Sequence, residues 1–312
     1  MAGVLIYSDN TSLAMELLTA ARLIAKDQNK SIKALTVNNP EQAEKLAAKG
    51  ADTYRIQNPD LTPADTAAMA SALQQAAEKL DGDIVLLSSN RRGKELAGRL
   101  AEGLGAGCLT DVKSINTGKD GLECVRNILG GATVGTQRII TVKKIIALSP
   151  KAYPAAEQEG VGSLQDLEVM IQASKLKLVE TREKAGENVD LEAAEILVVV
   201  GQGVEKQEQL ADVAVIAEAI NGVVACSKPV ATDRKWFGEE RIIGLSGKIC
   251  KPELAILLGI SGQVQFAVGI REAKTIVSVN KDENAIINKM SDYVLVADLN
   301  DVIPAFKNAL GK

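Results

Sequence analysis

The chain contains no histidine. Without an imidazole it cannot build a Ser-His-Asp or Cys-His nucleophile, an imidazole proton relay or a His-ligated zinc site of its own. Since these are the common means by which side chains alone perform catalysis, any redox or group-transfer chemistry must come mainly from a cofactor or a partner.

Aromatic residues are also scarce, at 3% of the sequence, whereas hydrophobic residues make up 46% of it. The core must therefore be built from Ala, Val, Ile and Leu, which suits buried parallel strands covered by Ala-rich helices. The few cysteines form no C-x-x-C pair and are widely spaced: Cys108, Cys124, Cys226 and Cys250. We expect reduced, mostly buried thiols, as is usual in a cytoplasmic protein.

No charge excess or long apolar run points to a nucleic acid or a membrane. The formal net charge is −4 with the two signs interleaved, so nucleic-acid binding is not expected. No apolar run approaches the roughly 20 residues that span a bilayer. A strand-like run begins almost at once, without a basic segment and cleavage site before it. We therefore expect a cytoplasmic protein with no membrane span, no export signal and no metal site.

The first half of the chain alternates strand and helix patterns, and with 312 residues the chain is long enough for two domains. Strands are predicted at Val4–Ser8, Ile32–Val37 and Ile84–Ser88, and helices at Thr11–Lys26, Pro40–Lys49, Thr62–Leu80 and Arg92–Leu104. Thr11 or Ser12 is a plausible cap of its helix, Gly50 a stop signal and Pro63 a first-turn residue. This alternation predicts a parallel sheet with crossover helices.

The character changes between about residues 122 and 179. The runs Glu123–Leu129, Arg138–Leu148 and Glu168–Lys177 alternate without intervening helices, which indicates added antiparallel strands, and Gly130-Gly131 marks a turn. The polar segment Thr181–Asp190 is the best linker candidate. We therefore expect an N-terminal α/β domain over 1–190 and a second α/β domain over 191–312.

The second domain carries polar or glycine-rich residues directly after several apolar runs. If it is a doubly wound (Rossmann-like) parallel sheet, these loops meet at the carboxyl edge of its strands, where such sheets bind nucleotides. The runs are Glu195–Val200, Val223–Ala225, Leu254–Leu258, Thr275–Val279 and Tyr293–Ala297. A nucleotide-type cofactor at this edge is the first hypothesis.

Two of these loops indicate a cofactor only when they are considered together with the others. Val200-Gly201-Gln202-Gly203 leads into a predicted helix at Lys206–Ile220 but lacks the third glycine of a dinucleotide fingerprint. A tight strand-to-helix turn without a ligand would look the same. Cys226-Ser227-Lys228-Pro229 offers a hydroxyl and an ammonium suited to a phosphate or an electron-rich ring edge, although a solvated turn is the alternative.

The other loops extend the set. Gly244-Leu245-Ser246-Gly247-Lys248 allows close backbone approach and offers a hydroxyl donor, although it too could be an ordinary loop. Gly259-Ile260-Ser261-Gly262 can present main-chain N–H groups to a pyrophosphate at the start of a helix beginning at Gln263. Asn280 and Asp298 follow strands, where an amide and a carboxylate could hold ribose or adenine edges.

These residues resemble the carboxyl-terminal FAD domain of electron transfer flavoprotein alpha subunits. GISGQVQF, beginning at Gly259, is similar to the family's GISG-x-x-Q-H element, SVNKD to its IN-K-D element, and DYVLVADL, ending at Leu299, to its DY-G-x-V-x-D element. Asn90-Arg91-Arg92-Gly93-Lys94 and Cys226-Ser227-Lys228-Pro229 look most like the FixB-type branch, which is associated with anaerobic acyl-CoA or carnitine-ester reduction.

The resemblance implies one FAD held largely by this chain, in a heterodimer with a beta subunit that often carries AMP or a second FAD. The implied function is electron transfer between a flavin dehydrogenase, such as an acyl-CoA dehydrogenase, and another redox protein. The FAD domain would swing about a hinge near residue 190. The residues implied to contact the cofactor are Gly201, Gln202, Gly203, Ser227, Lys228, Leu245, Ser246, Gly247, Gly259, Ser261, Gly262, Gln263, Gln265, Phe266, Asn280, Asp298 and Leu299.

Within that set the resemblance implies distinct roles. Ser227 and Lys228 would lie near the flavin and Ser246 near its N5 atom, whereas Asn280 and Asp298 would address the adenosine half. A further group would line the flavin and the phosphates: Ser261, Gly262 and Gln265.

Several positions depart from the family's pattern. Gln202 and Lys228 stand where the family usually has Arg, Leu245 where it has Gln, and Phe266 where it has the His beside the flavin pyrimidine. Because positive charge or a donor stabilises the negatively charged reduced flavin, Phe266 predicts a lower flavin potential than in His-bearing relatives.

Alternatives remain open at this point. Electron bifurcation of NADH electrons is a variant that this chain alone does not decide. The contrasting hypothesis is a self-contained nucleotide-dependent enzyme, or an adenine-nucleotide-binding regulator. Asn90–Lys94 is either a solvated basic turn or an interface with the beta subunit or a redox partner. Trp236-Phe237 is an interface anchor, a flavin-side contact or simple packing.

Overall fold

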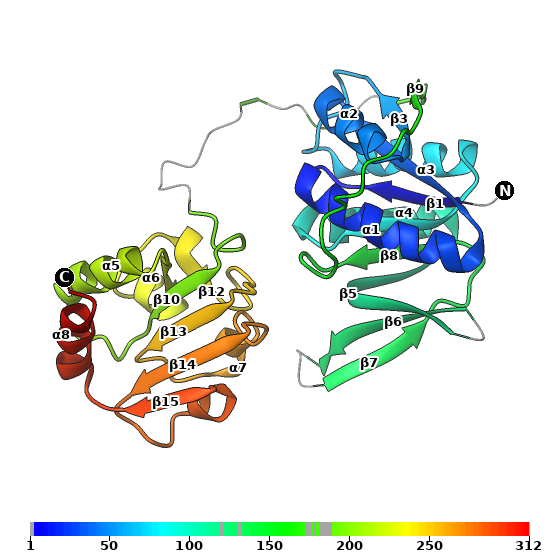
Figure 1. The fold of residues 1–312 in the computed structure, drawn as a ribbon. Helices are drawn as coiled ribbons and strands as arrows, with labels where there is room; N and C mark the ends of the chain where they lie inside the picture. The colour runs from blue at the N-terminus through cyan, green and yellow to red at the C-terminus, as the bar shows by residue number, and fades with distance from the viewer. Residues whose placement is uncertain are drawn as a thin grey trace. The chain divides into compact units, whose positions relative to one another are not determined.

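A computed structural model of the chain describes residues 3–118, 121–129, 133–171, 176, 179–180 and 189–311. The chain separates into two compact units, Met1–Thr181 and Arg182–Lys312. Each unit is a sheet with helices (Figure 1). The predicted turn at Gly130-Gly131 and residues 181–188 of the expected linker lie outside the described residues.

The N-terminal unit is built on a nine-stranded sheet in the order β7-β6-β5-β8-β4-β1-β2-β3-β9. Its strands are β1 Gly3–Tyr7, β2 Ser31–Val37, β3 Asp52–Ile56, β4 Gly82–Ser88, β5 Gly107–Gly118, β6 Gly121–Ile128, β7 Thr133–Arg138, β8 Lys144–Leu148 and β9 Leu164–Asp166. The strands from β9 to β5 pair in parallel, and β6 and β7 add antiparallel pairs at one end. The predicted fold class, a parallel α/β domain with added antiparallel strands, is confirmed.

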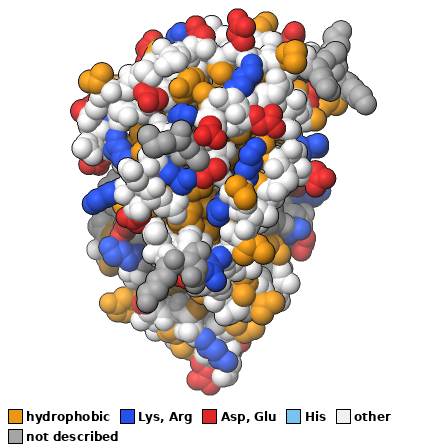
Figure 2. Space-filling view, turned by 90° about the vertical axis from the view of Figure 1, so that its right-hand side faces the viewer, with side chains coloured by type: hydrophobic (Ala, Val, Ile, Leu, Met, Phe, Trp, Pro, Cys, Tyr) orange, Lys and Arg blue, Asp and Glu red, His pale blue; other side chains and the backbone are white. Residues whose placement is uncertain are grey.

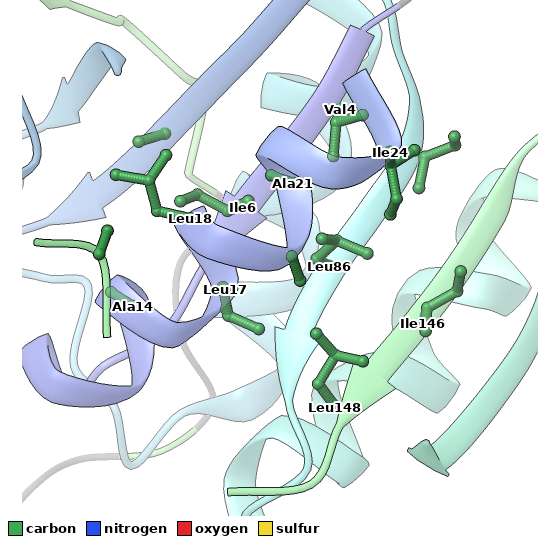
Figure 3. Close-up of a cluster of buried hydrophobic side chains, with 14 of the residues drawn as sticks. Val4, Ile6, Ala14, Leu17, Leu18, Ala21, Ile24, Leu86, Ile146 and Leu148 are labelled. Carbon is green, nitrogen blue, oxygen red and sulfur yellow. The ribbon is translucent and has the colours of Figure 1, made fainter. Parts of the chain in front are cut away.

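Helices cover both faces of this sheet, as the apolar periodicity of the first half predicted. They are α1 Thr11–Gln28, α2 Pro40–Ala48, α3 Thr66–Lys79 and α4 Arg91–Leu104. Leu17, Leu18 and Ile24 of α1 belong to the buried cluster that contains Ile6 and Leu86 of the sheet (Figure 3). The opposite face packs against α3 and α4, whose Met69, Leu73, Leu96 and Leu100 are buried.

Two helix starts differ from the prediction. The cap of α1 is Asn10 rather than Thr11 or Ser12, because the Asn10 side-chain oxygen accepts the Leu13 N–H at 3.1 Å. Helix α3 begins at Thr66, where the Asp65 carboxylate accepts two main-chain N–H groups, so Pro63 lies in the preceding loop. In both cases a side chain that satisfies the first free amides decides where the helix begins.

The structure also departs from the prediction at two of the three runs expected to be antiparallel strands. Arg138–Leu148 is broken at Thr141, whose hydroxyl accepts the Gly107 N–H at 2.7 Å and donates to the Lys143 carbonyl. The remainder of the run is β8, which pairs in parallel with β4 and β5. Residues 168–171 form no strand, because side chains of α3 hold their main chain; Gln75, for example, bonds both polar groups of Met170. Residues 172–175 and 177 lie outside the described part.

The C-terminal unit contains a six-stranded, wholly parallel sheet in the order β12-β11-β10-β13-β14-β15. The strands are β10 Ile196–Val200, β11 Val223–Ser227, β12 Ile242–Ile243, β13 Leu254–Leu258, β14 Thr275–Asn280 and β15 Tyr293–Val296. Renumbered within this sheet, the order is 3-2-1-4-5-6, the doubly wound arrangement that binds dinucleotides. The predicted Rossmann-like fold of this unit is confirmed.

Short elements lie between these strands or follow the last of them. They are the helices α5 Gln209–Ala219, α6 Lys228–Thr232, α7 Val264–Ala267 and α8 Leu299–Ala309, and the 3₁₀ turns η2 Glu239–Arg241 and η3 Ile286–Met290. Residues of α5, α6 and α8 cover one face of the sheet, whereas Phe266, Ile270 and Ile287 pack on the other. Strand β15 pairs only with β14, and its four apolar side chains are each between 45% and 65% exposed.

Other expectations from composition can be compared directly. All four cysteines are free, and three of them are buried. On the face drawn in Figure 2, Lys and Arg side chains are interspersed with Asp and Glu, without a broad area of one sign. Within the described ranges no helix combines the length and the apolar character that crossing a bilayer requires.

The contact between α4 and β4 predicts an asymmetric response to two glycine substitutions in one helix. A Cβ atom at Gly93 would lie 1.7 Å from the Ser88 carbonyl oxygen, whereas at Gly98 it would meet nothing within 4 Å. We expect Gly93→Ala to lower the free energy of unfolding of the N-terminal unit by at least about 2 kcal/mol. Gly98→Ala should raise it by about 0.5–1 kcal/mol.

Urea unfolding separates the two units, because the single tryptophan, Trp236, lies in the C-terminal unit. Circular dichroism should show the shift in Gly93→Ala while the tryptophan fluorescence transition stays unchanged. Equal midpoints for the two variants would contradict the close packing of α4 on β4.

Candidate functional site

The candidate site lies at the carboxyl edge of the C-terminal sheet, where β10 and β13 are neighbours. The chain continues from β10 to β11 on one side and from β13 to β14 on the other, so the loops after β10 and β13 diverge here. In doubly wound sheets this switch point leaves a crevice that accepts ligands. The predicted cofactor residues come from these loops and from those after β11, β12, β14 and β15.

The glycine-rich turn after β10 packs directly on the loop after β13. Gly201 donates its N–H to the Leu258 carbonyl at 2.8 Å, and Gly203 donates to the Gly259 carbonyl at 3.0 Å. A Cβ atom at Gly203 would lie 2.7 Å from the Cα of Gly259, and Gly259 itself has a φ of +65°. The two loops therefore approach as closely as they do only because both are glycine at this point.

The loop after β13 exposes main-chain donors. Ser261 accepts the Ile287 N–H through its carbonyl at 3.1 Å, and Gly262 has a φ of +86°. The main-chain N–H groups of Ser261, Gly262 and Gln263 have no acceptor within the part of the chain that the structure describes. Three successive amides without a partner are a donor set that suits an anion.

The helix expected to begin at Gln263 begins one residue later and is short. Helix α7 begins at Val264 and has only 4 residues, so it provides little macrodipole. The anion-binding capacity of the segment therefore comes from its loop amides.

The loop after β12 is held against the start of α7. Leu245 donates its N–H to the Gln265 carbonyl at 2.7 Å, and Gly244 has a φ of +132°. Leu245, Ser246 and Gly247 are all exposed, as is Gln265. The loop that carries Ser246 therefore lies beside the segment that carries the exposed Gln265.

Phe266, expected beside the flavin, is a core residue. It is 8% exposed and belongs to the cluster that includes Ile243, Ile270 and Ile287. The side chain at this position is therefore fixed by packing, and an apolar ring replaces a polar side chain without leaving a buried group unpaired.

Ser227 is the last residue of β11 and pairs in register with Ile243, which directly precedes Gly244. Lys228 is exposed and begins the short helix α6. The preceding Cys226 is fully buried, and burial raises the pKa of its thiol to about 12. The thiol therefore stays protonated at neutral pH and is not a nucleophile.

Asn280 acts on the neighbouring loop. Its side-chain amide donates to the Ile260 carbonyl at 2.8 Å, and its side-chain oxygen accepts the Asp282 N–H at 3.0 Å. In this structure the amide fixes the shape of the loop that carries Ser261, so its geometry favours positioning that loop over binding adenosine.

Asp298 caps α8. The main-chain N–H of Asn300, and then its side-chain amide, donate to the carboxylate and hold its pKa below the usual range, with a smaller contribution from Lys281. Lys281 itself forms an ion pair with Glu205 at 3.0 Å. Leu299, also in the predicted set, has a buried side chain. Asp298 therefore stays ionised, with acceptor sites left for a hydroxyl group.

The direct contacts thus join the turn at 201–203, the loops at 244–247 and 259–263, Gln265 and Asn280. Ser227 adjoins them through strand pairing, and Asp298 follows Ala297, whose N–H donates to the Asn280 carbonyl at 3.3 Å. The described residues contain no cluster of three or more acidic or cysteine side chains placed to hold a metal ion.

Sequence reasoning missed Arg234. Its guanidinium donates to the Gln202 carbonyl at 2.9 Å and to the Val204 carbonyl, and it lies over the Trp236 ring at 4.6 Å from the ring centre. Arg234 therefore holds the glycine-rich turn from outside, and Trp236 packs as its support. The Arg next to the rare Trp-Phe pair was the available signal, but the sequence did not show which loop it would reach.

The parallel sheet, the glycine contact at its switch point and the free loop amides define a Rossmann-like α/β protein with a site of the dinucleotide-binding kind. Residues 8–172 match the family described as "Electron transfer flavoprotein domain", and residues 190–271 match "Electron transfer flavoprotein FAD-binding domain". The chain is 32% identical to "Protein FixB" of Escherichia coli O157:H7 and to that of Shigella flexneri. Each alignment spans 315 residues and covers 99% of this chain and 98% of the relative. This chain belongs to the electron transfer flavoprotein alpha-subunit family, in its FixB-like branch.

The contacts of Arg234 predict a measurable change when it is replaced. Arg234→Gln should lower the free energy of unfolding of the C-terminal unit by about 1–2 kcal/mol, since two charge-assisted bonds to carbonyls are lost. Urea unfolding followed by Trp236 fluorescence measures this, and the emission should also shift as the cation leaves the ring.

Lys235→Gln is the matched control, because Lys235 is exposed and its substitution removes the same charge at the neighbouring position. Equal effects of the two substitutions would show that Arg234 does not hold the turn.

Proposed function

We propose that this chain is the FAD-binding alpha subunit of a heterodimeric electron transfer flavoprotein. It would carry electrons between a flavin dehydrogenase or reductase, of the acyl-CoA type, and another redox partner. The observation that carries the proposal is the close contact of Gly203 with Gly259 at the switch point, beside three free main-chain amides. Membership of the family supports the same cofactor.

The residues present fit a flavin dinucleotide. The free amides of Ser261, Gly262 and Gln263 would donate to the diphosphate, which needs no side-chain cation where such donors converge. The Ser246 hydroxyl would bond the edge of the flavin ring, and the Asp298 carboxylate would accept from a ribose hydroxyl. When bound, FAD supplies one- and two-electron transfer, and these residues supply binding, orientation and electrostatics.

The remaining residues of the predicted set would act through shape and charge. Gly201 and Gly203 would keep the loop after β13 close to the turn, and the exposed Lys228 would place a positive charge near the ring. Asn280 would hold the loop that carries the amides through its bond to the Ile260 carbonyl. The main chain of Leu245 and Gly247 would frame Ser246.

The exposed apolar strand β15 supports a protein partner for the C-terminal unit. Among the described residues β15 is an edge strand that pairs on one side, with β14, and exposes Tyr293, Val294, Leu295 and Val296. Proteins normally cover such an edge or break it with charge. In a heterodimer, a beta subunit would cover such a surface. Bifurcation of electrons would depend on a second flavin in that subunit.

The test is the flavin content of the chain co-expressed with its beta subunit. We expect a flavin spectrum and, after extraction, about one or two FAD per heterodimer, with two supporting bifurcation. In a Ser261→Glu variant, the added negative charge at the free amides should lower FAD retention at least about tenfold by repelling the diphosphate.

Ala305→Glu, which adds the same charge at an exposed position in α8, is the control and should retain FAD. A colourless wild-type complex that still bound adenine nucleotide would instead support the alternative, a nucleotide-dependent enzyme or regulator.

The apolar side chain at position 266 leads to a prediction about the reduction potential of the flavin. Phe266→His would introduce a ring N–H donor among apolar neighbours, where burial keeps the imidazole neutral. One added hydrogen bond of about 1.4 kcal/mol to the reduced form would raise the midpoint potential by about 30 mV for a two-electron couple. Spectroscopic redox titration measures the change.

Phe266→Leu keeps the cluster apolar and should leave the potential near that of the wild type. An unchanged or lower potential in Phe266→His would show that this position does not address the flavin.

A further inference from the structure

The N-terminal unit has a switch point of its own, away from the site described above. Strands β1 and β4 are neighbours, and the chain leaves β1 for α1 on one face of the sheet and β4 for α4 on the other. On the α4 face a shallow, open hollow lies at the carboxyl end of β1. Its polar lining is Tyr7, Asp9, Thr66 and Arg92, and Met69 and Leu96 form an apolar floor.

Tyr7 is the unusual member of this lining. The residue is 4% exposed, yet its hydroxyl makes no hydrogen bond to any of the residues that the structure describes. The neighbouring buried hydroxyls are paired, with Ser8 and Ser88 in contact at 3.0 Å and Ser89 bonded to Asp111 at 3.0 Å. A ligand oxygen at this hydroxyl would supply the acceptor that the described residues do not provide.

The Tyr7 phenol is a donor at any physiological pH. Burial, and then the negative charge of Asp9, raise its pKa well above the ordinary value, and the opposing effect of Arg92 is smaller. The hydroxyl therefore keeps its proton and can donate it to an anionic oxygen without becoming charged.

Donors of a second kind come from the start of α4. This helix has 14 residues, and Asn90 caps it by accepting the Gly93 N–H at 2.7 Å. The main-chain N–H groups of Arg91 and Arg92 have no acceptor among the described residues. A helix start of this length with two free amides and two guanidinium groups favours an anion.

One carboxylate opposes that charge. Asp9 accepts from the Arg92 guanidinium at 2.9 Å and from the Asn90 amide at 3.4 Å. The Arg92 side chain is nevertheless 56% exposed, so most of its donors face solvent. The nearby Lys94 is paired with Asp111 at 2.7 Å. At the hollow itself Arg92 and Asp9 balance in charge, and the exposed Arg91 follows Asn90 at the start of the same helix.

We propose that this hollow binds a small phosphate-bearing ligand. Its phosphate would lie at the start of α4, against the free amides of Arg91 and Arg92 and the Arg92 guanidinium, with the Tyr7 phenol donating to one oxygen. The rest of the ligand would cover Met69 and Leu96. Asp9 holds Arg92 when no anion is present and competes with the ligand for it.

Calorimetric titration of the flavin-loaded heterodimer with inorganic phosphate, at constant ionic strength in chloride, tests the site. The wild type should show one saturable site. Arg92→Gln should weaken binding at least about tenfold, since a charge-assisted bond is worth about 1.5–3 kcal/mol. Tyr7→Phe should weaken it about fivefold, and Asp9→Asn should strengthen it, because the competing carboxylate is removed.

Arg99→Gln is the matched control, since Arg99 lies on the exposed side of the same helix, paired with Glu95. Its affinity for phosphate should equal that of the wild type. Absence of saturable binding to the wild type overturns the proposal, as does an equal loss in Arg92→Gln and Arg99→Gln. Weaker or unchanged binding in Asp9→Asn overturns it too, and this variant leaves the Arg92 side chain in place. Flavin content, measured in each sample, reports separately on the C-terminal site.

Discussion

The candidate site depends on one main-chain contact, that of Gly203 against Gly259. A side chain on either residue would collide with the backbone of the other, because the ideal Cβ of Gly259 would lie 2.6 Å from the Gly203 Cα. With the two loops in contact, Gly203 can bond the Gly259 carbonyl, and the amides of residues 261–263 have no acceptor among the described residues. Arg234 holds the first of these loops and Asn280 the second. The site is thus a set of main-chain donors, fixed in place by side chains that lie around it.

The two units use the same topological idea with different chemistry. In the C-terminal unit glycines at the switch point let two loops touch and leave amides free. In the N-terminal unit the equivalent edge is closed by side-chain pairs such as Ser8 with Ser88, and the Tyr7 hydroxyl has no hydrogen bond to the described residues. A backbone site suits a large dinucleotide that needs room, whereas a side-chain site suits a smaller anion held by a few directed donors.

Sequence patterns predicted the parts of the fold that depend on local periodicity. Buried strands such as Leu254–Leu258 and the amphipathic helix at Arg92–Leu104 were recognisable, and the order of glycine-rich loops indicated the sheet edge that we propose for the cofactor. Strand β9 was not predicted, because its three residues are exposed and pair only with distant β3. The break at Thr141 was also invisible, since it depends on a hydrogen bond to Gly107, far along the chain.

For the site, the sequence predicted which loops would contribute, but not which groups their side chains would bond. The buried state of Phe266 follows from neighbours on three other segments, and the amide of Asn280 finds its acceptor only once β13 and β14 lie side by side. Arg234 bonds the turn across 32 residues of chain, and no spacing rule anticipates such a pair.

The uncovered edge strand β15 has a consequence for how the protein is made in the cell. A newly synthesised chain with Tyr293–Val296 exposed can add strands from other copies at this edge. In the proposed heterodimer, synthesis of the two subunits in matched amounts would shorten the time for which this edge stays uncovered. An excess of this chain over the proposed beta subunit would be prone to aggregate.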